Sequence, residues 1–354
     1  ADDMGHPSLL PYGELCGLFD ELRAKPLRCR PVYLEGVWGG FYIKRLRNLP
    51  REMKNCAWVF DMIPMEVSLA AVWPGHEIEV PFFTFVQQQG EKLLGKPAYD
   101  AFGGYFPVRF NYDDTFHSSG NMSIQCHPDA EWVVKQHGEL GRQDESYYVC
   151  VAGQDACTYL GFEEENSCEE FFAAAEKAQE TGETIDYKRY VHAVPSKPGT
   201  QVMIPAGTIH AICAGILVAE IQQNSDTTFR VYDYRRRGAD GQPRPLHLDR
   251  AAAVLRYEPM AARACQPLSV TAHAGWTETA LCACDYFSAA RLDVETRAAL
   301  TCGGDSFRHL LCVEGEGAVV HGGVRYPLRQ GDSYFLPAAL GDYAVEGQCR
   351  VLLS

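Results

Sequence analysis

The chain has 354 residues, of which 46% are apolar, 22% charged and 11% aromatic, and its 32 basic and 46 acidic side chains give a formal net charge of -14. This is the composition of a globular protein with one large or two modest domains. The excess of acid argues against a nucleic-acid or anionic-membrane binder, because either needs a basic face, and an anionic ligand would require locally concentrated basic side chains.

Neither a membrane span nor an export signal is expected. The most apolar stretch, 211–221, already carries Glu220 and is shorter than the roughly 20 residues that cross a bilayer. The first residues lack the basic-then-apolar pattern of a signal peptide. The 14 cysteines are scattered rather than clustered as in a small disulfide-rich domain, which indicates reduced thiols in a cytoplasmic protein.

The predicted elements begin with a helix and continue mainly as strands. Apolar residues at three- and four-residue spacing predict an amphipathic helix over 8–25. After Pro31, short β-branched and aromatic runs alternate with Gly, Pro and Asn, which is typical of strands and turns. Helical insertions are predicted at 129–137 and at 167–179, the second opening on a Ser-x-x-Glu capping box.

The second half returns to strands after Gly199, with one more helix predicted at 248–256 and short strands from 269 to the end. A glycine turn, five residues and a proline occur twice, at 199–205 and at 331–337. The repeat predicts a duplicated all-β unit, and many short, evenly spaced strands favour a barrel or jelly roll.

Two segments carry side chains that are typical of metal ligands. Gln125 and His127 are two residues apart, so on a strand both leave the same face. A strand and turn then deliver His210, and Glu145 adds a carboxylate. Two imidazoles, a carboxylate and an amide oxygen suit zinc or another first-row divalent ion. Taken singly, each of these residues is more often structural or polar surface, so the prediction depends on the combination.

Several motifs of the sequence resemble those of a known family. Its second half carries the pattern of the second cupin signature, and its first half carries a variant of the first signature with a helical insertion between His127 and Glu145. The strings SIQCHPD (123–129), PAGTIHAI (205–212) and EIQQNSDTTFRVYDY (220–234) are similar to motifs of type I mannose-6-phosphate isomerases of the cupin superfamily. Weaker similarities extend this resemblance over 31–354.

The resemblance implies a double cupin of jelly-roll barrels with short helical insertions, and it implies residue roles. Zinc would be held by Gln125, His127, Glu145 and His210. Arg230 matches the arginine that acts on the reacting sugar, and Glu220 matches an acidic residue of the same pocket. Ser123 falls where the family places a hydroxyl near the phosphate.

These roles fit the chemistry of aldose–ketose interconversion. Moving a proton between C2 and C1 passes through an enediolate, whose oxyanion charge a divalent ion and a guanidinium both stabilise. We expect Arg230 in this role, the alternative being a surface arginine paired with Asp226 or Asp233. Glu220 could move the proton or orient its neighbours, so the base stays unassigned.

The phosphate needs cations, for which Arg109, Arg142 and the run 235–237 are candidates, although such a run is more often a solvated turn. The sequence departs from the family at Gln143, which stands where a lysine is usual. The natural substrate could therefore be a related phosphosugar. The stretch 55–88 also lacks the usual Glu-Trp-Glu-Ile-Ser string of the family.

We therefore predict an N-terminal helical segment over 1–30, a catalytic metal-binding cupin over 31–260 and a C-terminal cupin-like domain over 261–354. In the last, Asp342 occupies the slot of His210, and no metal set is expected. The predicted function is zinc-dependent interconversion of mannose 6-phosphate and fructose 6-phosphate, with no nucleic-acid or membrane partner. The competing class is a non-catalytic cupin that binds metal or sugar, and an iron oxygenase is disfavoured by the Gln125 slot.

Overall fold

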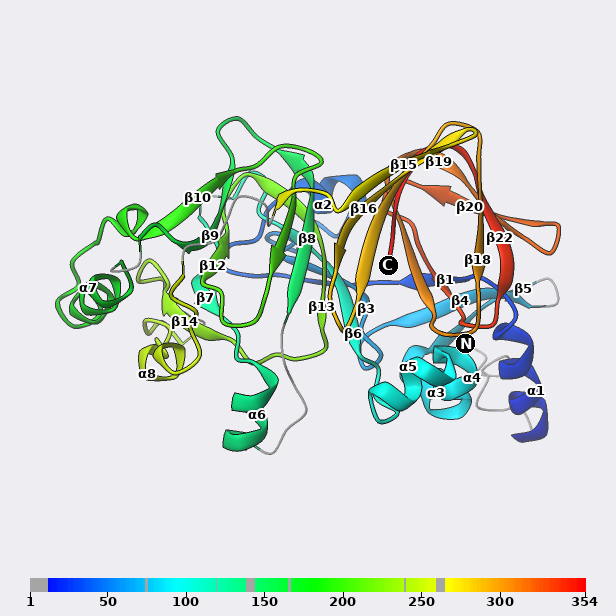
Figure 1. Ribbon diagram of the computed structural model, residues 1–354, viewed down its shortest axis with the longest axis horizontal. Helices are drawn as coiled ribbons and strands as arrows, with labels where there is room; N and C mark the ends of the chain where they lie inside the picture. The colour runs from blue at the N-terminus through cyan, green and yellow to red at the C-terminus, as the bar shows by residue number, and fades with distance from the viewer. Residues whose placement is uncertain are drawn as a thin grey trace. The chain divides into compact units, whose positions relative to one another are not determined.

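The structure is a computed structural model that describes residues 12–73, 76–118, 120–137, 144–164, 167–238, 240–258 and 265–354. The chain forms two compact units (Figure 1). The central unit comprises Tyr33–Phe60 and Val108–Gln266, and the terminal unit comprises the described parts of Ala1–Val32, Asp61–Pro107 and Pro267–Ser354. Each unit is built around antiparallel strands.

The central unit contains two antiparallel sheets. The first has the order β11 (Gln201–Ile204), β8 (Glu145–Ala152), β13 (Ile216–Gln223), β6 (Val108–Asp114), β3 (Trp58–Met62) and β2 (Val32–Leu34). The second has the order β10 (Val191–Pro195), β9 (Cys157–Phe162), β12 (His210–Ile212), β7 (Ile124–Cys126) and β14 (Phe229–Tyr232). Apolar side chains from both sheets share one buried cluster, including Tyr147, Leu160 and Val218. The two sheets therefore pack against each other as the layers of a β-barrel.

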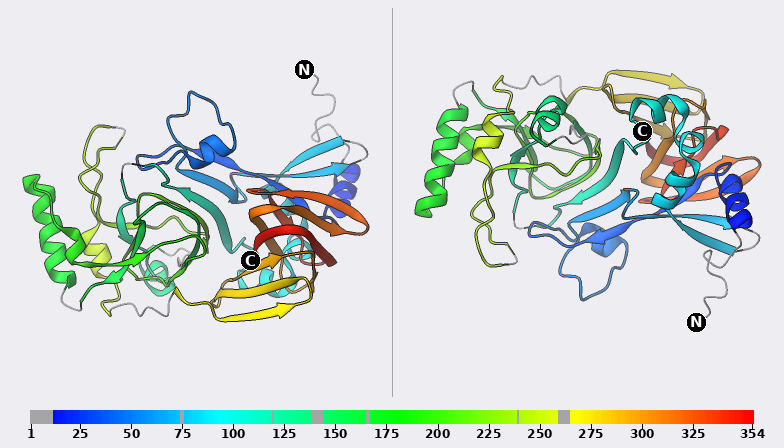
Figure 2. Two further views of the ribbon diagram at one scale, coloured as in Figure 1. Left: turned by 90° about the horizontal axis from the view of Figure 1, so that it is seen from above. Right: turned by 90° about the horizontal axis from the view of Figure 1, so that it is seen from below.

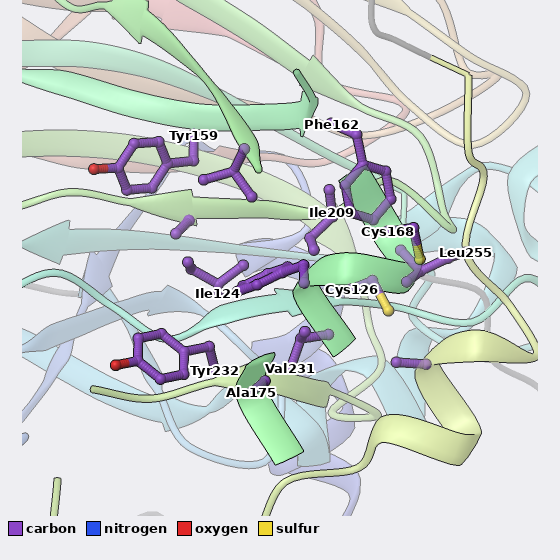
Figure 3. Packing of buried hydrophobic residues seen from close by; sticks show 14 of the residues in the cluster. Ile124, Cys126, Tyr159, Phe162, Cys168, Ala175, Ile209, Val231, Tyr232 and Leu255 are labelled. Atoms are coloured by element: carbon purple, nitrogen blue, oxygen red, sulfur yellow. The ribbon is translucent and has the colours of Figure 1, made fainter. Parts of the chain in front are cut away.

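The helices of this unit are α2 (Tyr42–Leu46), α6 (Ala130–His137), α7 (Ser167–Thr181) and α8 (Leu248–Ala252), with a short 3-10 turn at Tyr187–Arg189. On α7, the spacing of Phe171, Ala175 and Ala178 puts all three on one face, and all are buried. That face packs against Ile124 and Val231 of the second sheet (Figure 3). Burial of this apolar stripe holds the helical insertion on the barrel.

The terminal unit is one eleven-stranded antiparallel sheet. Its order is β15 (Ser269–His273), β16 (Trp276–Ala283), β17 (Ser288–Val294), β22 (Gly341–Leu353), β19 (Arg308–His321), β21 (Ser333–Leu336), β1 (Leu27–Arg30), β4 (Ser68–Trp73) and β5 (His76–Pro81). Two further strands pair beside this path, β18 (Arg297–Cys302) with β22 and β20 (Val324–Arg329) with β19. The β15–β16 hairpin, yellow in Figure 2, forms one end of the order. The strands curl around a core that includes Leu310, Val319 and Val351.

The described residues of the terminal unit form four helices: α1 (Tyr12–Leu22), α3 (Phe82–Gln89), α4 (Glu91–Leu94) and α5 (Lys96–Ala101). The rings of Phe19 on α1 and Phe85 on α3 lie 5.5 Å apart, centroid to centroid. The sequence did not predict α3, because its aromatic run FFTF has strand propensity. Burial of Phe82, Phe85 and Val86 overrides that local preference.

The predicted fold class is confirmed, and most predicted helices are present with shifted ends. The helix predicted at 8–25 spans Tyr12–Leu22, with residues up to 11 outside the described part. The repeated glycine turn is also present, because Gly199 (φ 94°) and Gly331 (φ 84°) adopt the left-handed conformation that favours glycine. Each turn leads into a short strand that ends just before the proline.

The division into units differs from the boundaries that the sequence suggested. Residues 61–107, which we placed in the catalytic cupin, and the N-terminal segment both join the C-terminal strands in the terminal unit. The reason is strand pairing, because β1 pairs with β21 on one side and with β4 on the other. An insertion between two strands of the central unit thus completes the other sheet.

Within the described residues, none of the helices combines the length and the apolar character that a bilayer crossing needs. The 14 cysteines all lie in the described part of the chain and are free thiols.

Candidate metal centre

Three buried side chains of the central unit converge on one point. His127 follows the end of β7, Glu145 begins β8, and His210 begins β12. The Nε2 atom of His127 lies 3.0 Å from Glu145 Oε1, and the Nε2 atom of His210 lies 3.2 Å from Glu145 Oε2. The ligand atoms of all three residues lie within 4.8 Å of one another. This spacing is suitable for a single divalent ion after small side-chain rotations.

Backbone carbonyls orient both imidazoles. His127 Nδ1 donates a hydrogen bond to the carbonyl of Thr227 at 3.0 Å, and His210 Nδ1 donates one to the carbonyl of Thr208 at 2.9 Å. With Nδ1 held in this way, the Nε2 atom of each ring faces the centre, where it is the atom that a metal would bind.

The donor set fits a cation rather than a hydrogen-bond network. The buried Nε2 atom of His127 makes no hydrogen bond with any described group, although it lies close to the carboxylate of Glu145. Burial alone would raise the pKa of Glu145, but the two facing imidazoles lower this pKa well below its ordinary value. Glu145 is therefore an anion that faces two nitrogen donors, as a zinc site requires.

The predicted fourth ligand, Gln125, lies beside the other three candidate ligands. In the second sheet, Gln125 on β7 is directly opposite His210 on β12, and Arg230 on β14 is opposite Gln125 on its other side. Side chains that stand opposite one another on paired strands share a face. The hydroxyl of Ser123 donates a hydrogen bond to Gln125 Oε1 at 2.8 Å, which fixes the orientation of this amide.

The four candidate ligands line a cavity of about 430 Å³ within the central unit. One wall is aromatic: the rings of Trp38 and Trp58 meet edge to face at 4.6 Å, and Phe60 extends this wall. The remaining lining is polar and charged. A cavity of this volume accommodates a small polar ligand beside a metal ion.

Two further acids face this cavity. Asn111 Nδ2 donates hydrogen bonds to Glu220 Oε2 at 3.0 Å and to Asp113 Oδ2 at 2.7 Å. Burial raises the pKa of Asp113 to about 6. Burial and the charge of Asp113 raise the pKa of Glu220 well above its ordinary value. Two carboxyl groups this close cannot both ionise easily, so the pair retains a proton near neutral pH.

Three arginines also line the cavity. Arg109 forms an ion pair with Asp226 and donates a hydrogen bond from Nη2 to Gln222 Oε1 at 3.1 Å. Arg244 donates two hydrogen bonds to the buried carboxylate of Asp233, at 2.5 and 2.6 Å. These anchored guanidiniums place fixed positive charge around the cavity despite the net acidity of the chain.

Arg230 is the third of these arginines. Its Nη1 atom donates to the carbonyl of Pro245 at 2.9 Å, whereas its buried Nε atom has no hydrogen-bond partner among the described residues. Burial lowers the pKa of Arg230 from its ordinary value. The alternative of a surface arginine paired with Asp226 or Asp233 does not apply, because those aspartates pair with other arginines. Arg230 thus has donor capacity for a ligand in the cavity.

Comparison with known proteins agrees with this geometry. Residues 277–354 match the family model described as the cupin domain of mannose-6-phosphate isomerase. The mannose-6-phosphate isomerase ManA of Bacillus subtilis is 28% identical over 350 residues, which cover 94% of this chain and 99% of ManA. The crystal structure of the mannose 6-phosphate isomerase from Bacillus subtilis has a TM-score of 0.76 at 25% identity and covers 93% of this chain and 98% of that one. Over nearly its whole length, the chain is therefore similar to mannose-6-phosphate isomerases.

A second relative also aligns over nearly the whole length of the chain. The probable mannose-6-phosphate isomerase GmuF of Bacillus subtilis is 29% identical over 338 residues, covering 93% of this chain and 98% of GmuF. The likeness therefore extends over both units of the chain and not only over its C-terminal part.

Most of the predicted site residues lie together in the central unit. The cavity brings together eight of them: Arg109, Ser123, Gln125, His127, Glu145, His210, Glu220 and Arg230. Arg142 and the neighbouring Gln143 lie outside the described residues. In the run 235–237, each arginine donates to a backbone carbonyl, and none of the three lines the cavity.

Sequence reasoning missed Asp113 and Arg244. The polar residues Arg109, Asn111 and Asp113 alternate along β6, so a period of two would have placed all three on one face. Arg244 lies beyond a turn, where no periodic pattern reports its direction. In the C-terminal part, Asp342 is close to Thr301 on β18, and it belongs to neither group of metal-ligand side chains found among the described residues.

Proposed function

We propose that the chain is a zinc-dependent aldose–ketose isomerase that interconverts mannose 6-phosphate and fructose 6-phosphate. The observation that carries this proposal is one cavity in which a convergent His, Glu and His set, an arginine with free donor capacity and a proton-holding carboxyl pair all lie together. A simple metal-binding module needs only the first of these features.

The candidate ligands are Gln125, His127, Glu145 and His210, whose nitrogen and oxygen donors suit zinc. Zinc bound there would supply Lewis acidity toward the sugar oxygens next to the reacting carbons. The Nδ1 hydrogen bonds already orient both imidazoles with Nε2 toward the centre, so metal binding needs little movement of the rings.

The charged residues of the cavity have three further roles: stabilising the enediolate, transferring the proton and binding the phosphate. Arg230 directs guanidinium N–H groups toward the negative charge that develops on the enediolate. The pair of Asp113 and Glu220 holds one exchangeable proton, which fits transfer between C2 and C1 of the sugar. Arg109 and Ser123 are proposed to bind the phosphate, and Arg244 provides a further positive charge near it.

The competing function is a non-catalytic cupin that binds metal or sugar. It would be favoured if Arg230 or Glu220 pointed away from the candidate metal ligands, yet both residues line the same cavity as those ligands. The isomerase is therefore the better supported function. A related phosphosugar is the alternative substrate.

A coupled assay on the purified, zinc-loaded full-length chain tests the proposal. We expect formation of fructose 6-phosphate from mannose 6-phosphate, loss of this activity with a chelator and recovery when zinc is restored. Unphosphorylated mannose serves as the control for the phosphate requirement, and glucose 6-phosphate tests selectivity at C2. A fully metallated protein that turns over none of the sugar phosphates would support the binding module instead.

A further inference from the structure

A second group of metal-ligand side chains lies in the terminal unit. Cys29, Asp61 and His309 each offer one ligand atom, and these atoms lie within 4.8 Å of one another. The group shares no residue with the cavity of the central unit. No sequence motif indicates this group, because its three residues come from distant parts of the chain.

Strand pairing brings these residues together. β21 lies between β1 and β19 in the sheet. The register that pairs Leu27 with Phe335 puts Cys29 opposite Ser333, and Phe335 is itself paired with His309 on the other side. Positions two apart on a strand share a face, so the side chains of Cys29, Ser333 and His309 leave the same face of the sheet.

Asp61 completes the group by contacting two members at once. Its Oδ2 atom lies 2.7 Å from His309 Nε2, and its Oδ1 atom accepts a hydrogen bond of 2.5 Å from the hydroxyl of Ser333. The four residues Cys29, Asp61, Ser333 and His309 are each at most 3% exposed. A carboxylate, an imidazole and a thiol thus meet in an interior without access to solvent.

We propose that Cys29, Asp61 and His309 bind a structural zinc ion, with the Ser333 hydroxyl beside them. Zinc bonds to sulfur, nitrogen and oxygen at roughly 2.0–2.3 Å, so donors that lie within 4.8 Å of one another need to shift by about 1 Å or less to surround it. A thiolate together with an imidazole selects zinc over magnesium or calcium. Because no donor is open to solvent, the ion has a structural and not a catalytic role.

A carboxylate and a thiolate together balance the two positive charges of Zn²⁺, and the imidazole adds a neutral donor. The bound site would therefore bury no net charge. The ion would enter as the chain folds, because the finished site is closed.

Such a site would connect three distant segments of the chain. Asp61 and His309 are 248 residues apart, and Asp61 and Ser333 are 272 residues apart. A metal crosslink there would stabilise the terminal unit as a whole, independently of the proposed isomerase function.

Cobalt substitution provides a direct test, because the candidate centre of the central unit contains no cysteine. The full-length protein is produced in cells supplied with cobalt, so that the metal is present during folding. We expect a near-ultraviolet sulfur-to-cobalt charge-transfer band in this protein, and we expect Cys29→Ser to abolish it. Cys302→Ser, which changes another buried cysteine of the same unit, should keep the band.

Metal content of the zinc-grown protein provides the second measurement and needs no Cys29 variant. We expect two equivalents of zinc per chain in the wild type and one in His210→Ala. A wild-type protein with a single equivalent that His210→Ala removes, or a cobalt-loaded wild type without the charge-transfer band, would overturn the proposal. The group would then be a hydrogen-bonded polar network only.

Discussion

His210 stands directly opposite Gln125 in the antiparallel pairing of β12 with β7. Arg230 continues the same row across the sheet on β14. One row of paired positions therefore carries two candidate metal ligands and the arginine that we assign to the reaction. Because residues in one row face the same way, the sheet sets the distance between metal and guanidinium.

Replacing the shared carboxylate should remove the metal. We expect Glu145→Gln to weaken zinc binding roughly 100-fold or more, because even loss of a residue that only supports a ligand costs 10–100-fold. Metal content after dialysis against a competing chelator measures the effect. Glu163→Gln, which alters an exposed glutamate that also contacts a histidine, is the matched control and should keep its zinc.

Loss of the Arg230 guanidinium should slow the reaction without emptying the metal centre. Removing one preorganised donor from a developing oxyanion typically costs about 100- to 1,000-fold in kcat, and we expect this range for Arg230→Gln. Steady-state kinetics and zinc content are measured on the same preparation. Arg237→Gln, at an exposed arginine outside the cavity, should have unchanged kinetics, and a fully active Arg230→Gln would refute the assigned role.

Arg109 should affect substrate binding more than turnover. If its guanidinium binds the phosphate, Arg109→Gln raises KM by roughly 10-fold or more and leaves kcat nearly unchanged, since the interaction is equal in the ground and transition states. Inhibition by inorganic phosphate should weaken in parallel. A fall in kcat at constant KM would instead place Arg109 at the reacting carbons.

Asp113 should make the metal-free protein less stable as the pH rises. Burial raises the pKa of Asp113 from 3.8 to about 6, so the folded protein holds this proton more tightly than the unfolded chain. The stabilisation is complete below about pH 4 and is lost as the pH rises through 6, with a total of about 3 kcal/mol. Asp113→Asn should therefore increase the free energy of unfolding at pH 8 but not at pH 4.

Urea unfolding of chelator-treated protein at the two pH values measures this difference. Asp155→Asn, at an exposed aspartate of the same unit, is the control and should show no such pH dependence. Equal effects of Asp113→Asn at pH 4 and pH 8 would contradict the raised pKa.

The helical insertion α7 should contribute measurably to the stability of the barrel. Phe171 is fully buried, and its ring stacks on Tyr190 with centroids 5.2 Å apart. We expect Phe171→Ala to cost about 3–5 kcal/mol, as is usual for a buried phenylalanine. Phe83→Ala at a largely exposed position should cost much less, and both are compared by chemical unfolding.

The sequence was most informative about candidate site residues that lie within short sequence motifs. Gln125 lies on β7 and His127 directly follows that strand, and the turn before His210 is set by neighbouring glycine and proline residues. Local spacing therefore indicated candidate metal ligands before any tertiary contact was known. The arginines were harder to assign, because the neighbours of Arg230 and Arg244 come from a turn whose path is fixed only by packing.

Long-range pairing accounts for what the sequence did not predict. Nothing near Asp61 indicates that it meets His309, because that contact depends on the register of strands from opposite ends of the chain. The same pairing moves residues 61–107 into the terminal unit. The helix α3 was missed because buried aromatic side chains, rather than backbone propensity, decide its conformation.

The position of β1 has a consequence for synthesis on the ribosome. Arg28 forms an ion pair with Asp332, a residue translated 304 positions later. At a translation rate of about 5–20 residues per second, roughly 15–60 s pass before β21, the strand that pairs with this edge of β1, has been synthesised. Throughout that interval the nascent chain exposes an unpaired strand edge, so its yield in the cell should depend on translation speed and on chaperones that shield such edges.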